Sequence, residues 1–441
     1  MAVGATLRLI GLDWDHGQHL HPDERFLSMV LVDIQPTANA LTYFDPATSP
    51  LNPFNHGVDF FVYGTFPLFL VDSIARVLDR ASYDDTYLVG RVLSALFDTG
   101  TIAVVFLLGR RLFGIWTGLL AASLMACAAH SIQIAHFFTV DTFATFFATS
   151  AIWLMSRFAD LRNPRDLTLA GIAIGLAMAS KLSSGLLILL FLGWWSYVGI
   201  REHLFSERWN RCHVWPLHAA TLLAFAALTF RLFQPYAFRY ASPFDWRLSP
   251  AFTSALTQQH AIQTGELDWP PGIQWAGTAP WLYPIEQIIR WGVGPTFGIA
   301  AFIGLALAMI VWWQSGHHPL AIPIVWTALN FAVFGAFVLK TMRYFHPIYP
   351  MLALVTAWTF IWLWRGGRKP WLKAQRHRRL AIGCVLSAVL GASALWALAF
   401  VQIYGRDHSR VAASAFIYEH VPHGSSIVVE HWDDALPLRL Q

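Results

Sequence analysis

The stretch from Asp13 to Arg25 gathers four carboxylates, three histidines and one arginine in a chain of which only 13% of residues are charged. Its adjacent carboxylates, Asp23 and Glu24, point in different directions in a non-helical stretch, so one can face a substrate while the other holds a basic group or a backbone amide. Pro22 restricts the backbone just before them, and we expect the pair in a non-helical stretch. The alternative is a solvated interfacial loop in which an aspartate caps a helix that begins near Arg25.

The three histidines of this stretch, His16, His19 and His21, could bind a metal together with Asp13 and Asp15. Imidazole and carboxylate groups are both suitable metal ligands. The spacing, however, matches none of the well-defined zinc patterns. A metal site is therefore the weaker interpretation, and we expect no metal or other cofactor to be required.

The composition is that of an integral membrane protein. The 441 residues are 56% hydrophobic, with a mean hydropathy of +0.47, whereas about 45–50% is usual for globular domains. The apolar residues occur in blocks of about 20, the length that crosses a bilayer as a helix, so we expect an all-α polytopic fold. The three cysteines, Cys127, Cys212 and Cys384, show no CxxC spacing, and no nucleotide-binding or nucleic-acid-binding motif is present.

About eleven transmembrane helices are expected, of which the first is truncated. The apolar stub from Val3 to Leu12 is too short to span the membrane. Two further short runs, Phe26 to Val32 and Phe66 to Leu78, are expected to form interfacial helices within the first external loop. The other spans are expected at residues 91–109, 115–129, 137–156, 167–179, 183–200, 214–233, 293–313, 320–339, 345–364 and 380–402.

The distribution of basic residues predicts the orientation. One set of short loops, within residues 110–111, 157–165, 201–211 and 365–379, contains fifteen Lys and Arg residues, and the opposite set contains three. Cytoplasmic loops carry the excess of positive charge. The external loops are then 12–90 and 234–292, within a membrane module of residues 1–402, and residues 403–441 form an extracytoplasmic segment that we interpret as the start of a small soluble domain.

Several charged residues on the outer side need partners. Asp141 lies one turn into an apolar segment, where an ionisable group costs a few kcal/mol unless it faces a polar cavity. Arg91, Lys181, Lys340 and Arg343 are cations on the side that disfavours them, which suggests a bound anion such as a lipid phosphate. The alternative is that each side chain snorkels to ordinary headgroups.

Taken together and in order, these motifs resemble those of the GT-C membrane glycosyltransferases. The chain is similar, within that group, to the protein O-mannosyltransferase and aminoarabinose transferase family, which uses a phospholipid carrier of the sugar. The resemblance runs from about residue 10 to about residue 360. It rests on Pro22-Asp23-Glu24, Tyr63-Gly64-Thr65-Phe66-Pro67-Leu68, Arg91, Asp141, Lys181, and Arg343-Tyr344 followed by Pro347 and Pro350.

The resemblance implies an outward-facing cavity in which a sugar passes from a polyprenyl-phosphate donor to an acceptor hydroxyl, with inversion and without a catalytic metal. Asp23 would be the general base, Glu24 would orient the site, and Asp141 would support the acceptor or a basic partner. Arg91 would pair with the carboxylates. The residues expected to bind the substrate and its phosphate are Arg91, Lys181, Lys340, Arg343 and Tyr344.

The partners implied are the lipid bilayer, the polyprenyl-phosphate sugar and an acceptor that is a protein, a lipid or a glycan of the cell envelope. The expected location is the plasma membrane of a prokaryote, with the active site outside the cytoplasm. The alternative function is a non-enzymatic transporter or flippase of lipid-linked saccharides. That alternative predicts ionisable residues at mid-membrane and on both faces, whereas here the unusual ones gather outside.

Overall fold

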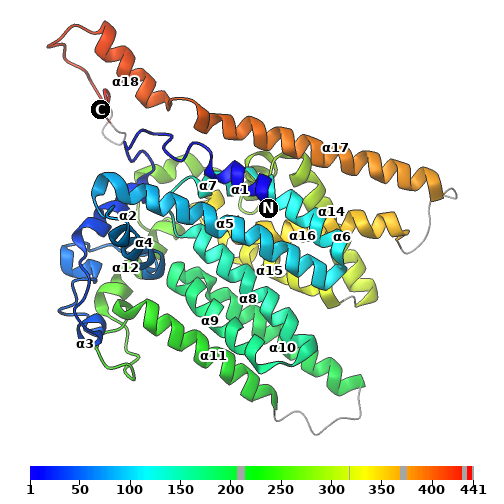
Figure 1. Cartoon of the computed structure of the whole chain (residues 1–441). Helices are drawn as coiled ribbons and strands as arrows, with labels where there is room; N and C mark the ends of the chain where they lie inside the picture. Colours follow the sequence, from blue (N-terminus) through cyan, green and yellow to red (C-terminus); the bar gives the residue numbers. More distant parts are fainter. Residues whose placement is uncertain (206–213, 317, 368–374, 430–434, 440–441) are drawn as a thin grey trace.

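The protein is all-helical, as predicted (Figure 1). The computed structural model describes residues 1–205, 214–316, 318–367, 375–429 and 435–439. Within these ranges the only β pairing is an isolated bridge between Phe238 and Leu248. The α-helices are α1 (Ala2–Leu9), α2 (Pro22–Asp33), α3 (Ala40–Phe44), α4 (Thr65–Val77), α5 (Tyr83–Phe113), α6 (Ile115–Ala126), α7 (Ala129–Ala135), α8 (Asp141–Leu161), α9 (Pro164–Ser180), α10 (Leu186–Phe205), α11 (Val214–Phe233), α12 (Pro250–Thr264), α13 (Leu282–Gln287), α14 (Pro295–Ser315), α15 (Ala321–Phe334), α16 (Tyr349–Arg365), α17 (Gln375–Val401) and α18 (Ser409–His420).

Short 3-10 and π segments join several of these helices. The ones that matter for the site are η2, which follows α9 directly, and η8, which leads into α16. The full set is η1 (Pro53–His56), η2 (Leu182–Gly185), η4 (Pro235–Ala237), η5 (Pro270–Trp275), η6 (Ile288–Gly292), η7 (His318–Leu320), η8 (Met342–Ile348) and η9 (Gln402–Gly405).

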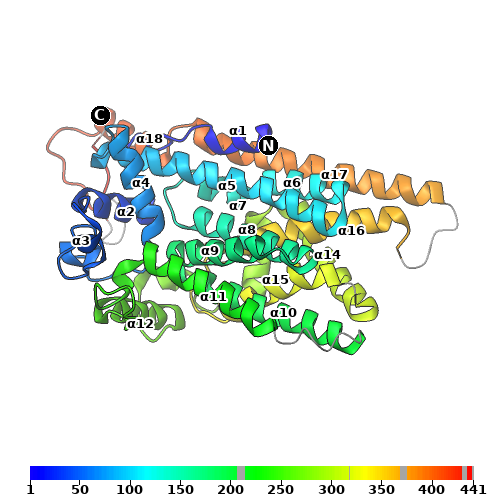
Figure 2. The ribbon, with the colours of Figure 1, turned by 60° about the horizontal axis from the view of Figure 1, so that its bottom comes forward.

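The short helices of the two predicted external loops lie at one end of the bundle. α2, α3 and α4 gather with α12 at that end in both views (Figures 1 and 2). The helices expected near Phe26–Val32 and Phe66–Leu78 are therefore present as α2 and α4. The side of the membrane that this end faces stays a prediction.

Fewer helices than eleven have the length and composition of a membrane span. Among the described residues there are six, or seven if the pair α6 and α7, bent by 61°, is counted as one broken span. The count of eleven is thus not confirmed, while an integral membrane protein is. Two expected spans are short helices: α9 has 17 residues and α15 has 14. The six spans are Tyr83–Phe113, Leu182–Ile200, Trp215–Phe233, Pro295–Ser315, Met342–Arg365 and Arg376–His420.

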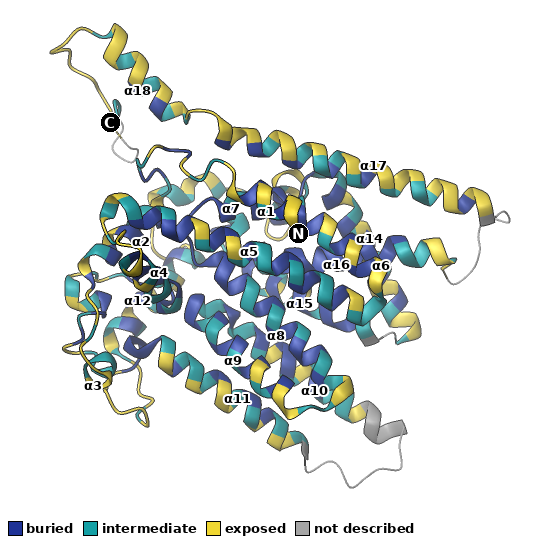
Figure 3. Ribbon diagram, in the orientation of Figure 1, coloured by how far each residue is buried: buried dark blue, intermediate teal, exposed yellow. Residues whose placement is uncertain are grey.

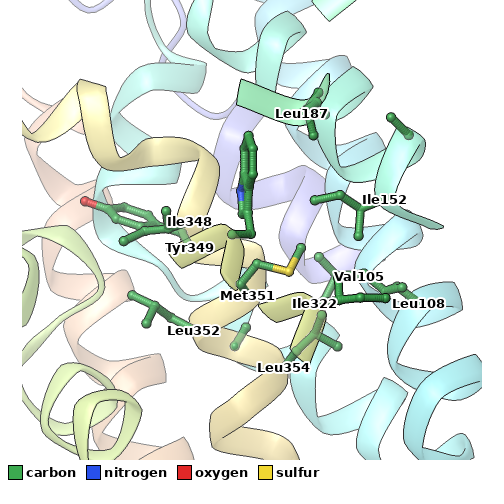
Figure 4. Packing of buried hydrophobic residues seen from close by; sticks show 14 of the residues in the cluster. Val105, Leu108, Ile152, Leu187, Ile322, Ile348, Tyr349, Met351, Leu352 and Leu354 are labelled. Carbon is green, nitrogen blue, oxygen red and sulfur yellow. The ribbon is translucent and has the colours of Figure 1, made fainter. Parts of the chain in front are cut away.

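The most enclosed span is the one that contains η8 and α16. In its apolar window 72% of the residues are buried, against 22% for the span that contains α17, and Figure 3 shows α17 and α18 as largely exposed ribbons. Figure 4 shows how Ile348, Tyr349 and Leu352 pack in the main core. Because α16 is surrounded by other helices, η8 at its start is fixed to the interior of the bundle.

Two glycines bring α9 and α11 into close contact. A Cβ atom at Gly171 would lie 2.7 Å from the Leu222 carbonyl oxygen, and one at Gly175 would lie 2.6 Å from the Ala226 carbonyl oxygen. Small residues spaced four apart let helix backbones approach closely within a membrane. The glycines therefore allow α9 and α11 to pack backbone against backbone.

Candidate functional site

Asp23 and Glu24 lie in the first turn of α2. The helix begins at Pro22, and the His21 ring nitrogen Nδ1 accepts a hydrogen bond from the Glu24 amide at 3.4 Å as an N-cap. The expectation of a non-helical stretch is therefore wrong, because proline suits the first position of a helix and acidic residues are stabilised near a helix N-terminus. The two side chains still point to different partners.

Glu24 is fully buried and bound to Arg91 of α5. Arg91 Nε donates to Glu24 Oε2 at 2.8 Å, and its terminal nitrogen lies 2.5 Å from Glu24 Oε1 and 3.0 Å from Asp15 Oδ1. The Phe138 amide also donates to Glu24 Oε2, at 2.8 Å. The other terminal nitrogen of Arg91 donates to the Leu12 carbonyl oxygen at 2.5 Å. This guanidinium thus ties α2 and the preceding loop to α5, and its donors are used by protein acceptors.

Asp23 forms an ion pair with Arg343 of η8. Both side chains keep some access to solvent, with exposed fractions of 15% for Asp23 and 29% for Arg343, whereas those of Glu24 and Arg91 are 0%. The partly exposed ion pair of Asp23 thus lies next to the buried ion pair of Glu24. This arrangement would allow Asp23 to meet a substrate while Glu24 holds the backbone of α2 in place. The next residue, Tyr344, is buried, and its hydroxyl accepts a hydrogen bond from the Gln263 side chain at 3.3 Å.

Lys181 joins Tyr344 to Asp141. Its ammonium nitrogen donates to Asp141 Oδ1 at 2.6 Å and lies 5.0 Å from the centre of the Tyr344 ring. Asp141 is the first residue of α8, where the helix dipole also favours a carboxylate. The order Asp23, Arg343, Tyr344, Lys181, Asp141 is therefore a continuous row of contacts and neighbouring residues at the same end of the bundle.

A glycine sets the position of the Lys181 turn. The Gly64 amide donates to the Ser180 carbonyl oxygen at 3.0 Å, and a Cβ atom at Gly64 would lie only 1.9 Å from the Ala179 carbonyl oxygen. Thr65 is in turn fixed by Gln234, whose side-chain oxygen accepts from the Thr65 amide at 2.6 Å. The segment after Tyr63 is thus hydrogen-bonded both to the end of α9 and to the residue that follows α11.

Tyr63 lies near Asp141 and Tyr344, whereas Lys340 is placed by its position three residues before Arg343. Lys340 is buried and donates to the Val338 carbonyl oxygen at 3.3 Å, no ion pair to it occurs among the described residues, and burial lowers the pKa of its ammonium group. Burial raises the pKa of Tyr63, as do the charges of Asp141 and Tyr344. Residue-by-residue reasoning did not select Tyr63 or Gln263, and it considered Asp15 only as a possible metal ligand and not as a partner of Arg91. The signal for Tyr63 was its place in the segment 63–68.

The three histidines of the opening stretch do not converge. His16 lies 3.2 Å from Asp407, His19 stacks on Tyr83 with ring centres 4.1 Å apart, and His21 stacks on Phe137 at 4.2 Å. Burial lowers the pKa of His21 to about 3, and the charges of Arg343 and Arg91 act in the same direction. No group of three potential metal ligands occurs in the part of the chain that the structure describes.

Two open cavities formed by described residues lie away from Asp23. One of about 650 Å³ lies over residues 242–247, and one of about 590 Å³ lies between Trp364 and Arg379. An outward-facing cavity at Asp23 therefore stays a prediction. What the described geometry offers at Asp23 is a partly accessible carboxylate next to Arg343, with the ammonium groups of Lys181 and Lys340 on the neighbouring turns.

Comparisons with known proteins show which proteins the chain is similar to. The family described as dolichyl-phosphate-mannose-protein mannosyltransferase matches residues 82–233. ArnT from Cupriavidus metallidurans, solved bound to undecaprenyl phosphate, superposes with a TM-score of 0.58 at 16% identity, over 95% of this chain and 78% of that one. The archaeal oligosaccharyltransferase AglB from Archaeoglobus fulgidus, solved with an inhibitory peptide and a dolichol-phosphate, superposes with a TM-score of 0.59 at 15% identity, over 96% of this chain.

The chain has the GT-C fold. The predicted resemblance to this group of glycosyltransferases is thereby confirmed. The chain spans 58% of the length of the archaeal oligosaccharyltransferase. No curated protein matches it.

Proposed function

We propose that the protein is a glycosyltransferase that moves a sugar from a polyprenyl-phosphate carrier to an acceptor hydroxyl at the extracytoplasmic face of a prokaryotic plasma membrane. The observation that carries this proposal is the row from Asp23 through Arg343, Tyr344 and Lys181 to Asp141, which places one accessible carboxylate beside several cations. The two neighbours solved with undecaprenyl phosphate and dolichol-phosphate support the choice of carrier.

In the proposed reaction, Asp23 accepts the proton of the acceptor hydroxyl as its oxygen attacks the anomeric carbon. The bond between that carbon and the phosphate oxygen breaks, and its electron pair leaves with the polyprenyl phosphate. A single displacement of this kind inverts the anomeric configuration. Arg343 and Lys340, with Lys181, would stabilise the charge that grows on the departing phosphate, an electrostatic contribution that is usually large.

The buried groups receive positioning roles in this proposal. Glu24 and Arg91 hold the first turn of α2 against α5, and we assign Arg91 to this task in place of the phosphate binding first expected, because its donors are already used. Asp141 orients Lys181, which is the basic partner anticipated for it. Of the two adjacent carboxylates, Asp23 is thus the proposed base and Glu24 the positioning group.

The test is the substitution Asp23→Asn in the purified protein. Detergent samples are supplied with undecaprenyl-phosphate-linked mannose or aminoarabinose and a mixture of envelope acceptors, and release of undecaprenyl phosphate is followed by mass spectrometry. Loss of a general base should lower turnover by about 10²-fold or more. The matched control is Asp33→Asn, which changes an exposed carboxylate at the other end of the same helix and should leave turnover unchanged.

Equal turnover by Asp23→Asn and the unsubstituted protein would remove Asp23 as the base. Movement of the lipid-linked sugar across a vesicle membrane, without any release of the carrier, would instead support the transporter or flippase alternative.

A further inference from the structure

A second charged cluster lies in the interior of the bundle, away from the accessible pair of Asp23. Arg8 of α1 donates from Nε to Asp98 Oδ2 of α5 at 2.5 Å. The other Asp98 oxygen lies 3.5 Å from His346 Nε2 in η8. All three side chains have an exposed fraction of 0%. A charge buried this deeply persists only when its partners are fixed, because an uncompensated one costs several kcal/mol.

Arg8 fixes one end of the cluster. Its terminal nitrogens donate to the carbonyl oxygens of Ala126 at 3.1 Å and Met125 at 3.2 Å. These are the last residues of α6, where the broken span turns toward α7. Helix carbonyls left open at such a break need a donor. Arg8 supplies it and thereby holds Asp98 in one place.

His346 fixes the other end. Its Nε2 lies 3.1 Å from the Ser131 hydroxyl of α7, and its Nδ1 lies 3.2 Å from the Thr145 hydroxyl of α8. The rings of His130 and Tyr349 stand edge-on to it, with centres 5.8 and 5.6 Å away. Both ring nitrogens are therefore engaged, one by α7 and the other by α8, and aromatic rings from α7 and α16 pack against the imidazole.

The same short helix carries the residues of the proposed site. η8 has seven residues and contains Pro347, so it has few backbone hydrogen bonds of its own. Arg343 and His346 are three residues apart, which is one turn of a 3-10 helix. Fixing the His346 ring therefore fixes the turn from which Arg343 and Tyr344 project.

We propose that His346, held by Asp98 and Arg8, is a positioning residue that aims Arg343 and Tyr344 at the phosphate of the donor. The inference rests on the proposed function for its kinetic consequence, but not for its structural one. If the His346 ring leaves this position, η8 can shift. A shift of about 1 Å at a binding group can cost on the order of 10²-fold in reaction rate. Because Arg343 meets the donor, the effect falls on donor recognition.

The experiment compares His346→Leu, which removes both ring nitrogens, with His346→Gln, whose amide can still donate and accept. His377→Leu is the matched control, since it changes an exposed histidine of α17. Hydrogen exchange of the backbone amides of residues 342–348 is measured in each purified variant. Exchange there should rise at least tenfold in His346→Leu, less in His346→Gln, and not at all in His377→Leu, while α14 remains protected in all of them.

The second measurement is kinetic, with undecaprenyl-phosphate-linked sugar as donor. His346→Leu should lower kcat/KM for the donor by about tenfold or more and leave the KM for the acceptor unchanged. In an Arg343→Ala background the same substitution should add no further effect, because residues that act through one another are not additive.

Three results would overturn the inference. These are unchanged exchange in η8, an unchanged kcat/KM for the donor, or effects of His346 and Arg343 that multiply independently. An unsubstituted protein that neither binds nor turns over the donor would instead contradict the proposed function. The exchange measurement would still decide whether His346 fixes η8.

Discussion

Replacing Gly64 with alanine should disable the site without unfolding the protein. The added Cβ atom would lie 1.9 Å from the Ala179 carbonyl oxygen and 2.5 Å from the Ser180 Cα atom. These are backbone atoms and cannot rotate away. Since real Cβ atoms essentially never approach closer than 3.0 Å, the two segments must separate by about 1.1 Å, the difference between 3.0 and 1.9 Å.

The size of the effect follows from that separation. Overpacking of this kind costs about 1–3 kcal/mol of stability, which a domain of this size can tolerate. The Gly64 amide would lose its 3.0 Å hydrogen bond to Ser180, the residue directly before Lys181. A displacement of about 1 Å at a catalytic cation costs on the order of 10²-fold in kcat/KM, or about 2.7 kcal/mol of transition-state stabilisation.

The assay is release of undecaprenyl phosphate, with thermal melting in the same detergent as a measure of folding. The control is Gly391→Ala in α17, where no atom lies within 4 Å of the added Cβ. Gly64→Ala should melt a few degrees lower and lose about two orders of magnitude in kcat/KM, and Gly391→Ala should do neither. Full activity in Gly64→Ala would refute the view that this contact positions Lys181.

Two further predictions concern stability. Arg91→Ala would leave the buried carboxylates Asp15 and Glu24 without their cation, so a loss of about 3–5 kcal/mol is expected; a melting temperature in detergent that equals that of the unsubstituted protein would contradict it. Burial lowers the pKa of His21 from its ordinary value of 6.5 to about 3 in the folded protein. Between these two pH values the unfolded chain therefore binds more protons than the folded one. The stability contributed by this group falls as the pH drops below about 6.5. His21→Asn retains a side chain suited to an N-cap, and it should lose less stability than the unsubstituted protein between pH 7 and pH 4; identical melting curves over that range would refute this.

The sequence indicated the charged residues of the site more readily than their partners. Asp141 and Lys181 stood out because each is an ionisable group in an apolar setting, and they contact each other. Arg91 was expected to pair with carboxylates, and it binds Glu24 and Asp15. The pairing of Asp23 with Arg343, 320 positions later, could not be foreseen, because no periodicity or loop length links residues so distant in the chain.

The predicted count of eleven spans was not confirmed, and the reason is physical. Hydropathy measures only how apolar a segment is, and it does not show whether lipid or protein surrounds that segment. The run from 115 to 129 contains no charged residue, yet α6 ends at Ala126 and the chain turns by 61°. At this break Arg8, which lies more than 100 residues away in the chain, donates to the carbonyl oxygens of Met125 and Ala126.

The close packing of α9 and α11 also has a consequence for the position of Lys181. α9 ends just before Lys181, and α11 ends just before Gln234. Both helix ends bind the same short segment. The Ser180 carbonyl oxygen accepts a hydrogen bond from the Gly64 amide, and the Gln234 side-chain oxygen accepts one from the Thr65 amide. If α9 slipped along α11 by one helical turn, these two hydrogen-bonding positions would move apart by about 5.4 Å. The contact of Gly171 and Gly175 with α11 therefore fixes the axial register of the two helices, and with it the position of Lys181 relative to Gly64 and Thr65.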